Sequence, residues 1–292
     1  MSSVRAEQAS VAWIGDPRQG PGAGQWGTPG ELNLPLDDRG LLLADGLFET
    51  VLVEEGEPRL LEAHLGRWQR SAALLEMAPP PGTEAIRELL EASLKHCKPP
   101  AAALRLNWSR GASMGRGLEM PKDHGTASAA GQGPRFWLQL SPVTLRFDPH
   151  SVVLSRHERR NADSRLSHCK TFAYGPAIAA RREAQRAGAD DALLLSTAGG
   201  LCCGTTANLL LRRGDRWLTP PLASGCLPGI MRNRALDLGL VVEAPLAPED
   251  LPGASGALLI NSLSCRPLGS YEGETLSPLT ALEAEQLWRS LL

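Results

Sequence analysis

One lysine stands in a context that could support covalent chemistry. The chain has 30 basic residues, of which only four are lysines: Lys95, Lys98, Lys122 and Lys170. Lysine, unlike arginine, can lose its proton and condense with a carbonyl group to form an imine. Lys170 lies just before an expected helix, and the phenol of Tyr174 follows four residues later. A single lysine is more often a solvated surface charge, so this context marks Lys170 only as a candidate.

Two glycine-containing segments could bind an anion such as phosphate. Residues 225–232, GCLPGIMR, form a turn that leads into an expected helix. Backbone N–H groups at a helix start attract anions, and glycine lets a phosphate approach closely. Residues 204–208, GTTAN, place hydroxyls and backbone donors after a turn. An ordinary helix entry and an ordinary turn are the alternative interpretations.

Arginines gather at the end of an expected strand and in the loop that follows it. Residues 105–111, RLNWSRG, precede Arg116 and Gly117. A guanidinium group can hold a carboxylate through two parallel hydrogen bonds, so these arginines could bind an acidic substrate. A solvated rim is the commoner role of arginine, and both interpretations stay open.

These candidates must be positioned by the regular elements that the apolar pattern predicts. In the first half of the chain, apolar residues recur at helical spacing over residues 59–77, and they alternate over residues 101–108. Helices are expected at 59–77 and 84–96, and strands at 11–14, 41–43, 48–53, 101–108 and 136–140. The small and polar residues 121–134 predict a flexible loop.

The second half alternates strands and helices more regularly. Pro176 near the start and Gly188 just past the end delimit one expected helix. Helices are expected at 176–187 and 230–238, and strands at 151–155, 192–196, 207–212, 216–219, 240–244 and 257–261. With a proline-flanked linker at 141–149, the pattern predicts a mixed α/β protein of the α+β class, with domains at 1–144 and 145–292.

Composition narrows the classes of protein that the chain can represent. It has 292 residues, a net charge of −2 and a pI near 6.3, and 42% of its residues are hydrophobic. These values are typical of a globular protein of two domains, at roughly 150 residues each. The sequence has no basic stripe interleaved with aromatics and no long apolar run, so neither nucleic acid nor a membrane is an expected partner. Six cysteines without framework spacing favour a reducing cytoplasm.

Taken together, the candidates resemble the class IV aminotransferase family. Motifs of that family occur in the right order between residues 36 and 267, at 38–50, 64–67, 110–117 and 188–195. The resemblance implies a pyridoxal 5′-phosphate enzyme with a small N-terminal α/β domain. It also implies a larger C-terminal domain with a barrel-like sheet, which carries the cofactor lysine.

The resemblance also implies a role for each matching residue. Lys170 falls on the Schiff-base lysine, and Tyr174 falls on the tyrosine that faces the pyridine ring. The arginine of the H-x-x-R motif, which grips the cofactor phosphate, corresponds to Arg67. The rest of the phosphate cradle corresponds to Thr205, Thr206, Gly229 and Ile230. The interdomain substrate loop corresponds to the segment that contains Arg110 and Arg116.

Within the family, the pattern is most similar to 4-amino-4-deoxychorismate lyase. Four residues separate Lys170 from Tyr174, and residues 261–267 match an N-S-L…R-P signature, which places Asn261 at the phosphate. The resemblance implies release of pyruvate and formation of 4-aminobenzoate for folate biosynthesis, by a cytoplasmic homodimer acting on a small molecule. No metal is expected.

Cys203 is the main departure from the family pattern. The family places a glutamate there, against the pyridine nitrogen, where a carboxylate keeps that nitrogen protonated. A neutral thiol does this poorly, and a lyase depends on the protonated ring less than a transaminase because its product is aromatic. Ala44 and Ala177 are smaller departures, at positions where glycine and asparagine are common.

Three alternatives stay open. The first is an aminotransferase of the branched-chain or D-amino-acid type on the same fold. The second is a relative whose catalysis is weakened or lost because Cys203 replaces the glutamate. The third is a metal-binding or redox-active thiol protein built on Cys202 and Cys203, although the chain lacks a C-x-x-C motif.

Overall fold

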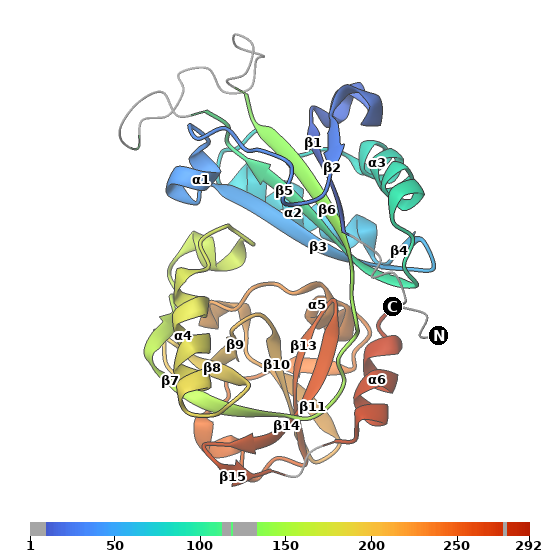
Figure 1. Ribbon diagram of the computed structural model, residues 1–292. Coiled ribbons are helices and arrows are strands. Elements are labelled where there is room, and N and C mark those ends of the chain that lie inside the picture. Colours follow the sequence, from blue (N-terminus) through green and yellow to red (C-terminus); the bar gives the residue numbers. More distant parts are fainter. Residues whose placement is uncertain (1–9, 113–117, 119–132, 277–278) are drawn as a thin grey trace. The chain divides into compact units, whose positions relative to one another are not determined.

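The computed structural model describes residues 10–112, 118, 133–276 and 279–292. The chain divides into two compact units. The first consists of Met1–Thr144 together with Lys170–Phe172, and the second of Leu145–Cys169 together with Ala173–Leu292. Figure 1 follows the elements of each unit along the chain. Most of residues 121–134, where the sequence predicts a flexible loop, lie outside the described residues, and so do Arg116 and Gly117.

The first unit is built on an antiparallel sheet with helices packed against it (Figure 1). The strand order is β2-β1-β6-β5-β3-β4, and β3 pairs with β5 along its whole length. The strands are β1 Val11–Gly15, β2 Gln25–Gly27, β3 Gly46–Glu54, β4 Glu57–Pro58, β5 Ala101–Ser109 and β6 Arg135–Pro142. The helices are α1 Arg39–Leu43, α2 Leu61–Leu74 and α3 Thr83–His96.

Large aromatic side chains fill the core of this unit. Trp68 of α2 is fully buried, and its ring centroid lies 6.3 Å from that of Phe136 on β6. Phe136 also contacts Trp13 of β1 at 5.8 Å. The tilted arrangement of these rings is one that aromatic pairs favour. The amphipathic pattern of α2 therefore fixes the helix against the sheet of the first unit.

The second unit is a closed barrel of six strands. Its order is β10-β13-β14-β7-β8-β9, and a pairing of Asn208 with Cys203 joins β9 back to β10. The barrel strands are β7 His150–Arg160, β8 Asp191–Ser196, β9 Leu201–Gly204, β10 Asn208–Arg213, β13 Gly256–Asn261 and β14 Ser264–Tyr271. Beside them lie β11 Arg216–Thr219, β12 Val241–Glu243 and β15 Glu274–Thr275. Leucines fill the inside, including Leu193, Leu209, Leu211, Leu259 and Leu268.

Three helices cover the outside of the barrel (Figure 1). Ala180 and Ala184 of α4 (Gly175–Arg186) pack against the outward residues of β8 and β9. The others are α5 Ile230–Asp237 and α6 Ala281–Arg289. Short 3₁₀ turns lie at Pro17–Gln19, Pro21–Ala23, Arg165–His168, Leu222–Ser224 and Pro248–Asp250. Within the described residues, no helix has both the length and the apolar character needed to cross a membrane.

The expected strand at 41–43 is wrong, because these leucines form helix α1. The Asp38 side chain accepts hydrogen bonds from the backbone N–H groups of Gly40 and Leu41, which starts the helix. Ala44 then ends it in the left-handed region at φ 54°. Three consecutive leucines fit the residue spacing of a helix as well as that of a strand, so the capping aspartate decides the conformation.

Lys170 groups with the first unit in the structure, whereas the sequence analysis places it in the C-terminal domain. Phe48 N–H of β3 donates to Lys170 O at 2.9 Å, and Phe172 N–H donates to Gly46 O at 3.0 Å. An antiparallel bridge pairs Leu47 with Thr171. These long-range contacts attach Lys170–Phe172 to β3 through an isolated bridge and two backbone hydrogen bonds. The sequence pattern did not predict the strands β2, β4, β9, β14 and β15 or the helix α6.

The barrel core should control the stability of the second unit. Leu211 is fully buried inside the barrel, so Leu211→Ala should lower the free energy of unfolding by about 2–5 kcal/mol. Urea denaturation measures this loss. Leu282→Ala is the matched control on α6, where the side chain is 64% exposed, and it should change stability by at most about 0.5 kcal/mol. Equal losses in the two variants would contradict the assignment of Leu211 to the core.

Candidate active site

Lys170 lies against an aromatic ring at the start of β3. Its Nζ is 4.3 Å from the centroid of the Phe48 ring, and the Phe48 side chain is buried. The main chain holds the same two residues together, because Phe48 N–H donates to Lys170 O. A hydrogen bond therefore fixes the main chain of Lys170, and its partly buried amine lies against the Phe48 ring.

A second cation lies over the same ring. The guanidinium carbon of Arg105, on β5, is 3.8 Å from the Phe48 ring centroid, and Arg105 Nε donates to Asn107 Oδ1 at 2.9 Å. Two cations that share one ring form a favourable place for a substrate carboxylate. The sequence analysis identified this arginine-bearing segment and named Arg110 and Arg116 as candidates. The place of Arg105 over the Phe48 ring comes from the structure alone.

A buried ion pair fixes the orientation of Arg67. Glu49 of β3 accepts two hydrogen bonds from Arg67, from Nε to Oε1 at 2.8 Å and from Nη2 to Oε2 at 2.6 Å. His64 Nδ1 lies 2.7 Å from Glu49 Oε2. The exposed fraction is 1% for Glu49 and His64 and 5% for Arg67. This geometry leaves the Arg67 guanidinium little freedom to rotate.

The charges in this cluster are set by burial and pairing. Burial alone would raise the pKa of Glu49, but the Arg67 guanidinium and the His64 hydrogen bond outweigh it and hold the pKa at about 2. Burial lowers the pKa of His64, and the positive charges of Arg67 and Lys170 act in the same direction against the pull of Glu49. At neutral pH the cluster therefore contains an ionised carboxylate, a charged guanidinium and a neutral imidazole.

The Arg110 side chain is hydrogen-bonded to other residues of the first unit. Its Nε donates to Asp45 Oδ2 at 2.9 Å, and its two terminal nitrogens donate to the carbonyls of Glu76 and Leu75, both at 2.8 Å. A substrate carboxylate would have to displace these partners. Substrate binding by Arg110 stays a prediction, and Arg116 lies outside the described residues.

The start of α5 has the features of a phosphate site. Gly229 is the N-terminal cap of the helix, and among the described residues no side chain caps it. A side chain at Gly229 would collide with Asn208 Oδ1, whose amide group in turn donates to Leu227 O at 2.9 Å. Glycine here leaves the backbone N–H groups at Ile230 approachable by an anion. These features fit a phosphate group.

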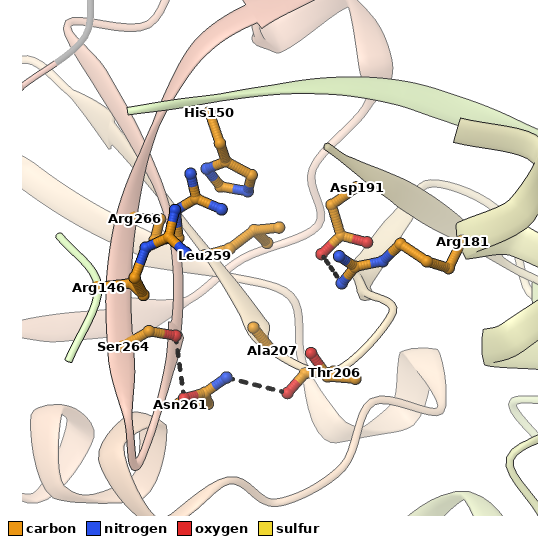
Figure 2. Close-up of a pocket in the computed structure, with 10 residues that line it drawn as sticks. All are labelled: Arg146, His150, Arg181, Asp191, Thr206, Ala207, Leu259, Asn261, Ser264 and Arg266. Atoms are coloured by element: carbon orange, nitrogen blue, oxygen red, sulfur yellow. Dashed lines mark hydrogen bonds and ion pairs between the residues drawn. The ribbon is translucent and has the colours of Figure 1, made fainter. Parts of the chain in front are cut away.

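Other expected phosphate ligands lie at one mouth of the barrel. The Thr205 hydroxyl donates to Asp191 at 2.6 Å and accepts from Arg181, so only its backbone is left for a phosphate. Thr206 and Asn261 line the same cavity (Figure 2), and Asn261 Nδ2 donates to Thr206 O at 3.5 Å. The structure thus brings Thr206 and Asn261 together.

The remaining expected residues lie on β9 and at the start of α4. Cys203 is buried on the outward face of β9, among the apolar residues that α4 covers. Tyr174 caps α4 and is partly exposed. Lys170, Arg67 and Arg110 belong to the first unit, whereas Tyr174, Cys203 and the residues of the phosphate cradle belong to the second. The cofactor and substrate roles of all these residues stay predictions.

Comparison with known proteins identifies the family. The model of the amino-transferase class IV family matches residues 46–271. The chain is 30% identical over 266 residues to the aminodeoxychorismate lyase of Bacillus subtilis, a match that covers 86% of this chain and 88% of the relative. It is 29% identical over 213 residues to a bifunctional aminodeoxychorismate lyase and D-amino acid transaminase of Mycobacterium tuberculosis, covering 66% of this chain and 68% of that one.

A solved structure agrees with this relationship. The pyridoxal-phosphate-bound form of a hypothetical aminotransferase from Mycobacterium tuberculosis superposes with a TM-score of 0.77 at 25% identity. The match covers 96% of this chain and 98% of that chain. The chain therefore belongs to the class IV aminotransferase family. Members of this family are pyridoxal-phosphate-dependent enzymes, and the uncapped, glycine-started helix α5 fits the phosphate of that cofactor.

The Glu49 carboxylate should contribute to stability in a pH-dependent way. Because its pKa is about 2 in the folded protein instead of the ordinary 4.5, its contribution is complete above pH 4.5 and is lost as the pH falls through 2. Glu49→Gln leaves Arg67 buried without its partner and should cost about 3–5 kcal/mol at pH 7. Thermal unfolding in steps from pH 7 to pH 3 measures the difference from the wild type.

We expect that difference to shrink below pH 4.5. Glu57→Gln, at an exposed position on β4, is the matched control and should behave like the wild type throughout. A constant difference at all values of pH would show that Glu49 does not act through its charge.

Proposed function

We propose that the protein is a 4-amino-4-deoxychorismate lyase, which forms 4-aminobenzoate and releases pyruvate. The observation that carries this proposal is the match over 266 residues, at 30% identity, to an aminodeoxychorismate lyase. The N-S-L…R-P signature supports it, and so does the buried thiol of Cys203 where the family has a carboxylate. The same resemblance leads us to propose a cytoplasmic homodimer acting in folate biosynthesis.

We propose the following division of work for cofactor binding. Lys170 holds the cofactor covalently, Tyr174 faces its ring, and Cys203 lies at the pyridine nitrogen. Backbone and side-chain donors hold the phosphate: Arg67, Thr205, Thr206, Gly229, Ile230 and Asn261. The Glu49 carboxylate would fix the orientation of the Arg67 side chain, because it accepts hydrogen bonds from two of the guanidinium nitrogens.

The chain's own residues would then orient the substrate and move a proton. Bound pyridoxal phosphate supplies an electron-withdrawing ring conjugated to the amino group of the substrate. The Lys170 amine would remove the proton from C4 of the substrate ring. The C–O bond to the enolpyruvyl group would break, the released enolpyruvate would gain a proton to become pyruvate, and the carbocycle would become aromatic. Arg105 lies over the same ring as Lys170 and would hold a substrate carboxylate.

Cys203 favours a lyase over a transaminase. A protonated pyridine nitrogen is most valuable when the cofactor must store the electron pair and return it to a second substrate. A thiol does not hold that proton as a carboxylate does. In the lyase reaction the electron pair leaves with the enolpyruvyl group, and aromatisation supplies driving force.

Lys170→Ala should abolish the reaction. Cofactor-loaded protein is incubated with chorismate, glutamine and an aminodeoxychorismate synthase, and 4-aminobenzoate is measured by its fluorescence. The wild type should form 4-aminobenzoate, and K170A should form none above the rate without enzyme, because it has no amine to move the C4 proton. Lys95→Ala, an exposed lysine of α3, is the control and should keep full activity. Substantial 4-aminobenzoate formation by K170A would overturn the proposal.

The second candidate function is a D-amino acid aminotransferase, because one relative is named for both activities. Cys203→Glu restores the family's carboxylate and should raise the rate of amino transfer from D-alanine to 2-oxoglutarate by at least about tenfold. Pyruvate formation from D-alanine is followed with lactate dehydrogenase, and Cys203→Gln is the uncharged control. If the unaltered protein already transfers amino groups faster than it forms 4-aminobenzoate, the aminotransferase assignment is the correct one.

A further inference from the structure

One face of the sheet in the first unit carries aromatic and polar side chains on three adjacent strands, β3, β5 and β6 (Figure 1). Residues that pair directly across antiparallel strands point to the same face of a sheet. The register pairs Phe48 of β3 with Asn107 of β5, and Asn107 with Trp137 of β6. In the next row, Thr50 pairs with Arg105. Two rows of this face therefore bring aromatic, amide and guanidinium groups together.

The opposite face of the same sheet belongs to the core. Leu104 and Leu106 of β5 and Leu138 of β6 are fully buried, each with an exposed fraction of 0%. Arg105 and Trp137, which alternate with these leucines, are only half-buried. The period of two along β5 and β6 thus separates a core face from the face that carries Arg105 and Trp137.

Phe172 joins the Trp137 face from the segment that pairs with β3. Its ring centroid lies 5.6 Å from that of Trp137 and 6.3 Å from that of Phe48. A side-chain carbon added at Gly46 would lie 2.2 Å from Phe172 Cε2, so glycine is needed for the ring to lie this close to β3. The rings of Phe48, Phe172 and Trp137 therefore form one packed aromatic surface.

Two cations lie beside this aromatic surface. Lys170 Nζ is 4.3 Å from the Phe48 ring centroid, and the guanidinium carbon of Arg105 is 3.8 Å from it. Asn107, which is 2% exposed, accepts a hydrogen bond from Arg105 Nε and donates one to Trp137 O at 3.2 Å. The amide thus orients the guanidinium next to the rings. Such a pair of groups fits a carboxylate attached to a flat ring.

We propose that the half-buried rings of Trp137 and Phe172 are a substrate subsite, which selects a flat carbocycle bearing a carboxylate over an acyclic amino acid. This inference rests on the proposed function, in which the carbocycle of the substrate becomes aromatic. Contacts between aromatic rings stabilise a planar carbocycle more than a puckered one. The subsite therefore binds the substrate more strongly as its ring flattens, and this difference favours the reaction.

Isothermal titration of cofactor-loaded protein with benzoate and with cyclohexanecarboxylate tests the subsite. The two ligands carry the same carboxylate and differ in the flatness of their rings, and neither has an amine that could react with the cofactor. We expect benzoate to bind about fivefold more tightly, because only its ring can stack. Trp137→Leu should abolish this preference, and Trp137→Phe should keep most of it because it keeps a ring.

Trp217→Leu, in the second unit, is the matched control. Trp217 is also half-buried, and the guanidinium carbon of Arg212 lies 5.6 Å from its ring centroid. W217L should prefer benzoate like the wild type. Arg105→Gln separates the two halves of the ligand: it should weaken the binding of both carboxylates to the same extent and leave their ratio unchanged.

Three outcomes would overturn the subsite. Equal affinities of the wild type for the two ligands would mean that the rings do not select a planar carbocycle. Equal loss of the preference in W217L and W137L would mean that the loss is not local to the aromatic surface. Unchanged affinities in R105Q would mean that the carboxylates bind elsewhere. Phe172→Leu should also reduce the preference, and it tests the subsite if W137L fails to fold.

The binding measurements need no turnover, so they separate this inference from the proposed function. Protein that prefers benzoate through Trp137 but forms no 4-aminobenzoate would refute the lyase activity and leave the subsite in place. Protein that forms 4-aminobenzoate but binds the two carboxylates equally would keep the lyase activity and refute the subsite.

Discussion

Two backbone hydrogen bonds, between β3 and the segment around Lys170, hold the chemistry of this protein in place. They join Phe48 to Lys170 and Phe172 to Gly46, so three residues from far along the chain become part of the first unit. Backbone hydrogen bonds on both sides of Thr171 fix the main chain of this segment relative to β3. The lysine amine, the Phe48 ring and Arg105 are therefore set by one strand and its partner.

That strand also organises the ion pair at α2. Glu49 follows Phe48 directly, and its buried carboxylate holds both Arg67 and His64. A buried carboxylate is tolerated only when charged or polar partners satisfy it, so the three side chains depend on one another. In the barrel, β9 places Cys203, and Gly229 leaves the start of α5 open to an anion. The first unit thus holds a partly buried amine and a paired guanidinium, and the second unit has an uncapped helix start.

Strong periodic patterns predicted much of this fold from the sequence. Helices α2 and α3 and the strands β3, β5 and β6 follow clear amphipathic or alternating patterns, and their positions agree with the structure to within a few residues. Strand β14 was missed because arginine, proline and glycine interrupt its alternation. The leucines at 41–43 fit either period, and only the Asp38 cap makes them helical.

The parts of the site that depend on distant contacts could not be predicted in the same way. The motifs identified Lys170, but only its pairing with β3 places it in the first unit. Arg105 emerged from its position over Phe48, not from its sequence neighbours.

Chemical trapping can establish whether Lys170 binds the cofactor covalently, as we propose. Cofactor-loaded protein is reduced with borohydride, digested and analysed by mass spectrometry. We expect the peptide that contains Lys170 to gain the mass of the reduced cofactor, and the peptides with Lys95, Lys98 and Lys122 to keep their mass. Reduced cofactor on another lysine, or on none, would overturn the role proposed for Lys170 and leave the family relationship without the proposed chemistry.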